Sequence, residues 1–134
     1  MNRLAIFIAA SLTFSSAVAS TDNPTNDELS DWMTYLRSVS LPVTIETCPS
    51  VLPENSDYAK IANLWLDSHD EQIKRGHDFA VAGSPKDRDF DQYTAKMLAD
   101  FKEKFQAKPS DAKLKMCEDS LETLQKVAAK SGGA

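Results

Sequence analysis

Both histidines of the chain lie in one short segment, residues 67–79, which reads DSHDEQIKRGHDF. Ser68, His69 and Asp70 are the side-chain types of a catalytic triad, in which serine attacks, histidine takes its proton and the acid orients the histidine. On a helix, however, consecutive side chains point about 100° apart, so these three are not expected to hydrogen-bond in that order. No G-x-S-x-G turn presents another serine. The sequence therefore predicts no catalytic residue and no enzyme.

The same histidines are the first candidates for a metal site. His69 and His77 are eight residues apart, which is about 12 Å along a continuous helix. One metal ion with bonds of about 2 Å cannot bind both side chains at that separation. The two histidines meet only if the helix breaks at Gly76. We expect no metal site here, with a break at Gly76 as the exception.

Two further patterns suggest ligands and are weaker. Residues 87–91, DRDFD, resemble the start of a calcium-binding loop, but Gln92 and Leu98 stand where an EF-hand needs glycine and glutamate. These acids suit the first turn of a helix, where the helix dipole favours negative charge. Methionines and histidines could ligate haem in a helical bundle, yet Met97 falls within a predicted core stripe and methionine is a common core filler. We expect no cofactor.

The N-terminus predicts export. Arg3 precedes an apolar run, Leu4 to Phe14, and Ala17-Val18-Ala19 reads as a cleavage site before Ser20. The apolar run is shorter than the roughly 20 residues of a transmembrane helix, so an uncleaved anchor is the lesser alternative. The signal looks bacterial, which predicts a periplasmic protein, with secretion from another kind of cell left open.

Removal of residues 1–19 leaves 115 residues, enough for one domain with one core. We divide the chain into a signal peptide (1–19), a flexible tail (20–26), a single helical domain (27–130) and a frayed end (131–134). Cleavage changes the net charge from −5 to −6, because the removed residues contain one base and no acid. This acidic balance disfavours nucleic acid and anionic lipid as partners.

The two cysteines, Cys48 and Cys117, are predicted to form one intramolecular disulfide after export. The bond closes a loop for which chain entropy alone gives roughly 4 kcal/mol of stabilisation. An intermolecular bridge or a reactive thiol is the alternative. Neither cysteine belongs to a C-x-x-C redox motif.

Apolar spacing predicts four helices. The first starts near Asn26 or Asp27 and is followed by a connection that Pro42, Pro49 and Pro53 break, with Cys48 in its middle. The second runs from Ser56 or Asp57 into the low eighties and bends or ends at Gly76. Ser84, Pro85 and Asp87 are expected to cap the third helix, and Cys117 lies on the apolar stripe of the fourth. The four predicted stripes are Leu29, Trp32, Met33, Leu36 and Val39; Tyr58, Ile61, Leu64, Trp65, Ser68, Gln72 and Ile73; Phe90, Tyr93, Met97, Leu98, Phe101 and Phe105; and Leu114, Cys117, Leu121, Leu124 and Val127.

This pattern predicts an all-α fold, a small four-helix bundle in which the disulfide ties the proline-rich connection to the last helix. In size, export, helicity and cysteine count the chain is similar to small periplasmic helical proteins. Immunity proteins against type VI secretion amidases and acid-stress chaperones with one disulfide are of this kind. The similarity is one of architecture and carries no residue roles to this chain.

We therefore expect an exported, non-enzymatic interaction protein, an inhibitor or immunity factor against a secreted or cell-wall-directed effector. Its partner is a protein, and no membrane anchor remains after signal cleavage. The predicted contact residues are acids that flank two exposed turns, Asp70, Glu71, Asp78, Asp87 and Asp89. A stress chaperone is the main alternative, and a metal- or haem-binding bundle is the lesser one.

Overall fold

The computed structural model describes residues 23–131, with side chains through Val127. The predicted signal peptide (1–19), the first part of the predicted tail (20–22) and residues 132–134 of the predicted frayed end lie outside the described residues. Within residues 23–131, no helix is long and apolar enough to cross a membrane. The elements in chain order are α1 (Asn26–Val51), the 3₁₀ turn η1 (Glu54–Ser56), α2 (Tyr58–Ser68), α3 (Asp70–Gly83), α4 (Phe90–Gln106) and α5 (Ser110–Ser131).

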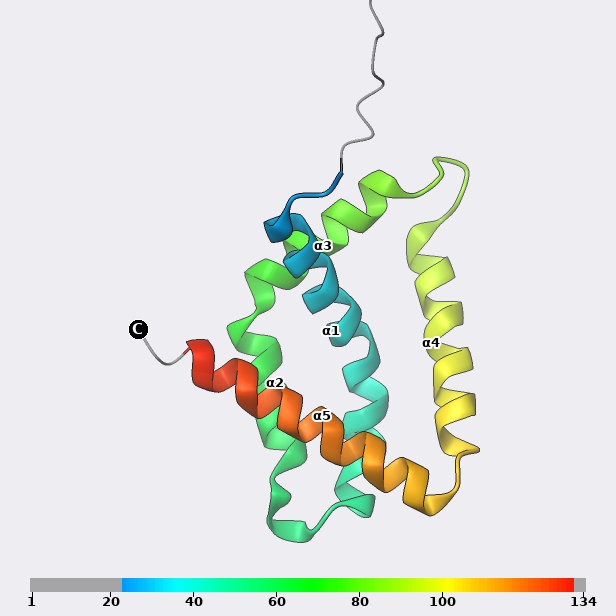
Figure 1. The fold of residues 1–134 in the computed structure, drawn as a ribbon. Coiled ribbons are helices and arrows are strands. Elements are labelled where there is room, and N and C mark those ends of the chain that lie inside the picture. Colours follow the sequence, from blue (N-terminus) through cyan, green and yellow to red (C-terminus); the bar gives the residue numbers. More distant parts are fainter. Residues whose placement is uncertain (1–22, 132–134) are drawn as a thin grey trace, which may run out of the picture.

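The all-α prediction is confirmed, but the four-helix bundle is not, because the described part of the chain forms five α-helices. Figure 1 shows α1 running through the centre, with α2 and α3 on one side and α4 on the other. Helix α5 crosses obliquely over α1 and α2. Helix α1 contacts each of the other four helices, and α5 also contacts α2. The fold is therefore organised around α1.

Helix α1 begins as predicted and extends much further than predicted. A capping box fixes its start: the Thr25 hydroxyl accepts from the Glu28 amide at 3.2 Å, and Glu28 Oε2 accepts from the Thr25 amide at 2.8 Å. The predicted break at Pro42 and Pro49 is wrong, since both prolines lie inside the helix. The proline-rich connection is thus largely helical, and Cys48 belongs to α1.

Burial explains why α1 continues through Pro42. Proline lacks an amide hydrogen and crowds the carbonyl four residues back, at a cost of about 3 kcal/mol within a helix. Leu41 and Val43 beside it are only 1% and 4% exposed, and full burial of each such side chain contributes roughly 1.5–3 kcal/mol. Continuing the helix also places Cys48 in the core. The two effects of packing together match or exceed the cost of the proline.

The second predicted helix is divided in two, and the break is at His69, not at Gly76. The His69 backbone leaves the helical region (φ −110°, ψ 12°) between α2 and α3. The Ser68 hydroxyl donates to the Trp65 carbonyl oxygen at 3.0 Å, and His69 Nδ1 lies 2.8 Å from the same oxygen. Side chains that bond to nearby carbonyls in this way compete with the helical hydrogen bonds and favour a break.

Gly76 lies inside the continuous helix α3 and is buried. A Cβ atom built on Gly76 would stand 2.0 Å from the carbonyl oxygen of Asp31 and 2.7 Å from Tyr35 Cβ, both on α1. Glycine therefore permits the close approach of α3 to α1 rather than a bend. This contact therefore sets which side of α1 faces α3.

The start of α4 also differs in detail from the prediction. Asp89 is the N-cap, and its Oδ1 accepts from the Gln92 amide at 3.0 Å. Ser84, Pro85 and Asp87 lie in the connection between α3 and α4 and do not cap the helix. The helices predicted around residues 90–105 and 114–127 are confirmed as α4 and α5.

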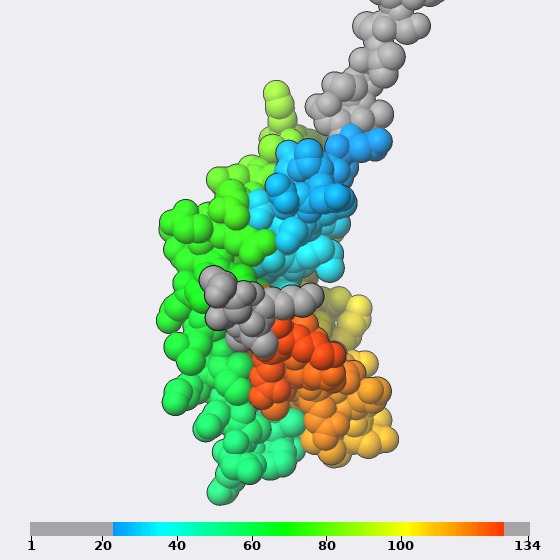
Figure 2. Space-filling view, turned by 60° about the vertical axis from the view of Figure 1, so that its left-hand side comes forward, coloured from blue at the N-terminus to red at the C-terminus, as the bar shows by residue number. Residues whose placement is uncertain are grey.

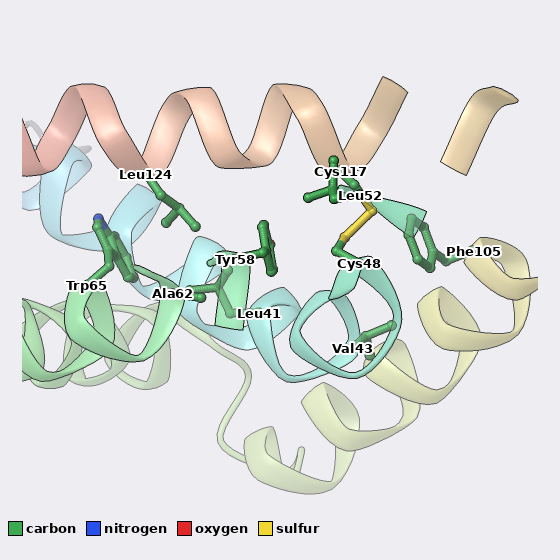
Figure 3. Packing of buried hydrophobic residues seen from close by; sticks show 10 residues of the cluster. All are labelled: Leu41, Val43, Cys48, Leu52, Tyr58, Ala62, Trp65, Phe105, Cys117 and Leu124. Atoms are coloured by element: carbon green, nitrogen blue, oxygen red, sulfur yellow. A yellow bond between two sulfur atoms is a disulfide. The ribbon is translucent and has the colours of Figure 1, made fainter. Parts of the chain in front are cut away.

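The predicted disulfide is confirmed. Cys48 of α1 and Cys117 of α5 are bonded, with their Cα atoms 5.5 Å apart and a separation of 69 positions in the sequence. Figure 3 shows the bond inside the core, beside Leu52 and Phe105. At the start of α2, the Tyr58 hydroxyl hydrogen-bonds Thr44 Oγ1 of α1 and Ser120 Oγ of α5, each at 2.8 Å. Covalent and hydrogen bonds thus connect α1, α2 and α5.

Candidate functional site

Ser68 and His69 contact each other at the break between α2 and α3, but Ser68, His69 and Asp70 do not hydrogen-bond in the order of a triad. Ser68 Oγ lies 2.9 Å from His69 Nδ1, and the same nitrogen lies 2.8 Å from the Trp65 carbonyl oxygen. A carbonyl oxygen only accepts, so the shorter contact places the proton on Nδ1 and leaves no lone pair there to activate the serine. Asp70 pairs with Lys74 at 2.8 Å instead of orienting His69. The pair therefore lacks the roles of a triad.

The two histidines have separate surroundings. His69 stacks on the Trp65 ring, with centroids 4.4 Å apart. His77 makes edge contacts with Tyr35 and Phe90, and its Nε2 lies 3.1 Å from Asp91 Oδ1. Since α3 is continuous through Gly76, the condition under which the histidines could meet is not fulfilled. Among residues 23–131, no three histidine, cysteine or acidic side chains are grouped so as to hold a metal ion.

The five acids predicted to contact a partner do not form one patch. Asp70 and Glu71 open α3, whereas Asp87 and Asp89 lie just before α4. A helix the length of α3 separates the two groups by about 20 Å. Asp78 lies between them on α3, with its Oδ1 3.6 Å from His77 Nδ1. Asp89 already serves as the α4 cap.

The charge contacts of α3 hold it in place against α1. Arg75 donates from Nε and from one terminal nitrogen to the two Asp31 oxygens, at 2.9 and 3.2 Å. This hydrogen bond and the charge of Asp31 raise the pKa of Arg75. The hydrogen bond to Asp70 likewise raises the pKa of Lys74 above its ordinary value of 10.5. The Arg75–Asp31 pair joins α3 to α1, whereas the Lys74–Asp70 pair lies within α3.

Sequence reasoning missed the most distinctive surface, which lies on α1. We call it the α1 stripe, and it consists of Leu29, Trp32, Met33 and Leu36. These residues were predicted to face the core, yet all four are exposed, with Met33 at 53% and Leu36 at 40%. The face that packs inward carries Thr34, Tyr35, Leu41 and Thr44 instead. One feature of the sequence could have indicated this surface: α1 has apolar side chains on two sides. The other helices can cover only one of these sides, so the other stays exposed.

A groove lies along the N-terminal end of the α1 stripe. Its volume is about 360 Å³, and its walls come from α1, the end of α3 and the start of α4. We call it the aromatic groove after the side chains that line it, Leu29, Trp32, Phe79, Arg88, Phe90 and Tyr93. A volume of this size lies within the range of ligand pockets, roughly 300–1,000 Å³.

A second groove lies at the C-terminal end of the stripe, between α1 and α5. Its volume is about 420 Å³, and Met33, Leu36 and Ser40 face Asp119, Ser120 and Thr123 across it. Figure 2 shows this part of the molecule from the side: the first half of α1 (blue to cyan) lies at the surface directly above α5 (orange to red). The α1 stripe therefore connects two grooves on an open face.

Helix α4 exposes two more residues that were predicted to be core. Tyr93 is 43% and Met97 is 53% exposed, so the interpretation of Met97 as a core filler is wrong. Phe105 is buried, and Leu98 and Phe101 are partly buried against the core cluster. Only the last turns of α4 therefore belong to the core, while its first half contributes Tyr93 to the aromatic groove.

Comparison of the chain with models of protein families, with curated proteins and with solved structures found no match. No residue role is therefore carried over from another protein. The proposals for function rest on the contacts and exposed surfaces of this chain.

Proposed function

We propose that this chain is an exported, non-enzymatic protein that binds a partner protein through the α1 stripe, as an inhibitor or immunity factor does. The observation that carries the proposal is the exposure of Leu29, Trp32, Met33 and Leu36 on one open face. Contiguous exposed apolar side chains on soluble proteins mark interaction surfaces, because leaving them in water has a cost that binding removes.

The rigidity of α1 supports this proposal. The capping box fixes its first turn, Gly76 locks it against α3, and the disulfide joins its other end to α5. A surface that is already in place loses little conformational entropy when it binds, which favours tight association. Tight, stable binding is the property on which inhibitors and immunity proteins depend.

The disulfide supports the location. A buried disulfide suggests a non-cytoplasmic, oxidising compartment. Together with the predicted signal peptide, this leads us to propose the periplasm, where secreted and cell-wall-directed effectors act. Only some of the acids that were predicted to contact a partner lie near this surface. Asp87 and Asp89 flank Arg88 of the aromatic groove in the sequence, whereas Asp70 and Glu71 lie at the other end of α3.

Site-specific photo-crosslinking tests the proposed function. A benzophenone amino acid is placed at Leu36 in the full chain, which is expressed with its own signal sequence in its native cell. The matched control carries the same group at Leu64 of α2, which is 59% exposed and lies outside both grooves. We expect one protein to be captured from Leu36 and not from Leu64.

The captured protein is then purified and mixed with the mature chain. The proposal requires a stable complex, weakened at least tenfold by Leu36→Asp, and a loss of the partner's activity in the complex. Equal capture from both positions, or a complex that Leu36→Asp leaves unchanged, contradicts it.

A stress chaperone is the second candidate, and the attachment of α4 is the observation that favours it. Two charge contacts join α4 to the rest of the described chain, His77–Asp91 at 3.1 Å and Lys102–Glu46 at 2.9 Å. Each pair contains a carboxylate, and acid in general neutralises carboxylates. Exposed ion pairs contribute only about 0–1 kcal/mol each, however, so acid alone would do little to release α4 from the other helices. A client-aggregation assay at pH 7 and pH 3 tests this candidate, and absence of protection at pH 3 excludes it.

A further inference from the structure

The aromatic groove contains a single charged side chain, and that side chain lies where it can bind an anion. Arg88 is the only charged residue among those that line the groove. Its guanidinium carbon lies 4.7 Å from the centroid of the Tyr93 ring. Within residues 23–131, Arg88 forms no ion pair: the neighbouring Asp89 accepts from the Gln92 amide instead, and Asp87 forms no ion pair with Arg88 either.

The walls of the groove are fixed before anything binds. Phe90 packs beside Tyr35, with ring centroids 6.2 Å apart, and beside His77 at 5.6 Å. The His77–Asp91 contact joins the first turn of α4 to α3. The N-cap Asp89 and the capping box at Thr25 fix the two helix starts that border the groove. The aromatic rings and Arg88 thus line a site with an apolar floor and one positive group.

We propose that the aromatic groove binds a peptide segment of the partner protein in which a bulky apolar side chain stands next to a carboxylate. The apolar side chain packs against Trp32, Phe90 and Tyr93. The carboxylate accepts hydrogen bonds from the Arg88 guanidinium, whose planar geometry suits a two-point contact with a carboxylate. This inference rests on the proposed function, since it states which feature of the partner the surface recognises.

Two isosteric dipeptides test the recognition without the partner. The probes are N-acetyl-phenylalanyl-aspartyl-amide and its asparaginyl counterpart, which differ in charge and hardly in shape. Each is titrated into the oxidised, ¹⁵N-labelled mature chain, and the resonances of the Trp32 indole and of the Leu29 and Tyr93 amides are followed. We expect the aspartyl probe to shift these resonances and to bind at least tenfold more tightly than the asparaginyl probe.

Variants of two arginines assign the preference to Arg88. Arg88→Gln is expected to abolish the difference between the probes, and Arg88→Lys to retain part of it. Arg37→Gln is the matched control, because Arg37 also lies over an aromatic ring, that of Trp65 at 5.8 Å, but outside the aromatic groove. Unchanged resonances elsewhere in the spectrum show that each variant is folded.

Four results overturn the inference. Three of them are equal binding of the two probes to the natural chain, a preference that survives Arg88→Gln, and shifts that fall outside the groove. The fourth is saturation of the groove by dodecanoate at a tenfold lower concentration than the aspartyl probe, which would show that the groove binds lipid. If a partner is captured from Leu36 while the probes fail, only this inference is lost. If the probes bind as expected and no partner complex forms, the proposed function is lost instead.

Discussion

Gly76 of α3 faces Asp31 of α1 so closely that a Cβ atom on Gly76 would stand 2.0 Å from the Asp31 carbonyl oxygen. This contact brings Arg75 within reach of the Asp31 carboxylate and sets the packing of Tyr35 against α3. It also turns the opposite side of α1, with its stripe of apolar residues, toward solvent.

Gly76→Ala is therefore expected to destabilise the chain. Overpacking against backbone costs typically 1–3 kcal/mol, while alanine in place of an interior glycine gains about 1 kcal/mol. We expect a net loss of up to about 2 kcal/mol in the free energy of unfolding, measured with urea. Gly83→Ala is the control, since a Cβ there meets nothing within 4 Å, and it should leave stability unchanged or slightly higher. Equal stability of both variants would show that the helices are further apart.

The α1 stripe should tolerate polar substitution while the core face of the same helix should not. Leu36→Ser changes a side chain that is 40% exposed, and we expect a loss below about 1 kcal/mol. Leu41→Ala removes a side chain that is 1% exposed, at an expected cost of about 2–5 kcal/mol. Urea unfolding of the two variants compares them directly. A larger loss for Leu36→Ser than for Leu41→Ala would mean that the stripe is core.

Pro42→Ala should stabilise the chain. Alanine restores an amide that can donate to the Ser38 carbonyl oxygen and removes the crowding of the proline ring, which together cost about 3 kcal/mol. The greater freedom of the unfolded chain offsets part of this gain by about 0.4–1 kcal/mol, so we expect a net gain of about 2 kcal/mol. Pro53→Ala is the control, because Pro53 lies outside the helices, before η1. A thermal melt in which Pro53→Ala is the more stable variant contradicts the account of α1.

The hydroxyl of Tyr58 should contribute to stability through its two partners. Tyr58→Phe leaves the buried Thr44 and the half-buried Ser120 without this bond, at an expected cost of about 1–2 kcal/mol. Tyr93→Phe removes an exposed hydroxyl and should change the unfolding free energy by less than about 0.5 kcal/mol. A double-mutant cycle of Tyr58→Phe with Ser120→Ala measures the coupling, and strict additivity would rule out the hydrogen bond between them.

Loss of the disulfide should be among the largest effects. The Cys48→Ser, Cys117→Ser double variant gives up a constraint over 69 residues, for which chain entropy gives about 4 kcal/mol. Because the two sulfurs are bonded to each other and both cysteines are buried, the natural chain should also resist alkylation until it is unfolded and reduced. Mass measurement after treatment with iodoacetamide checks the second point, and two alkylated thiols in folded protein from the native cell would exclude the bond.

The sequence alone determined the all-α class, the pairing of Cys48 with Cys117 and the presence of α4 and α5. Each depends on local or composition-level information: apolar spacing of three and four, clear breaks around residues 84–89 and 107–109, and a single possible pair of cysteines. It also placed the start of α1 near Asn26 or Asp27, and the structure shows that a local capping box fixes this start.

Only the tertiary structure decided the path of α1 through Pro42, the break at His69 and the side of α1 that is buried. A proline cost of about 3 kcal/mol is a local property, but the burial of Leu41, Val43 and Cys48 that offsets it exists only once α2 and α5 are in place. Likewise, spacing shows that α1 has two apolar faces and cannot show which one α3 covers. That choice follows from the close contact of Gly76 with Asp31, which brings together residues 45 positions apart in the sequence.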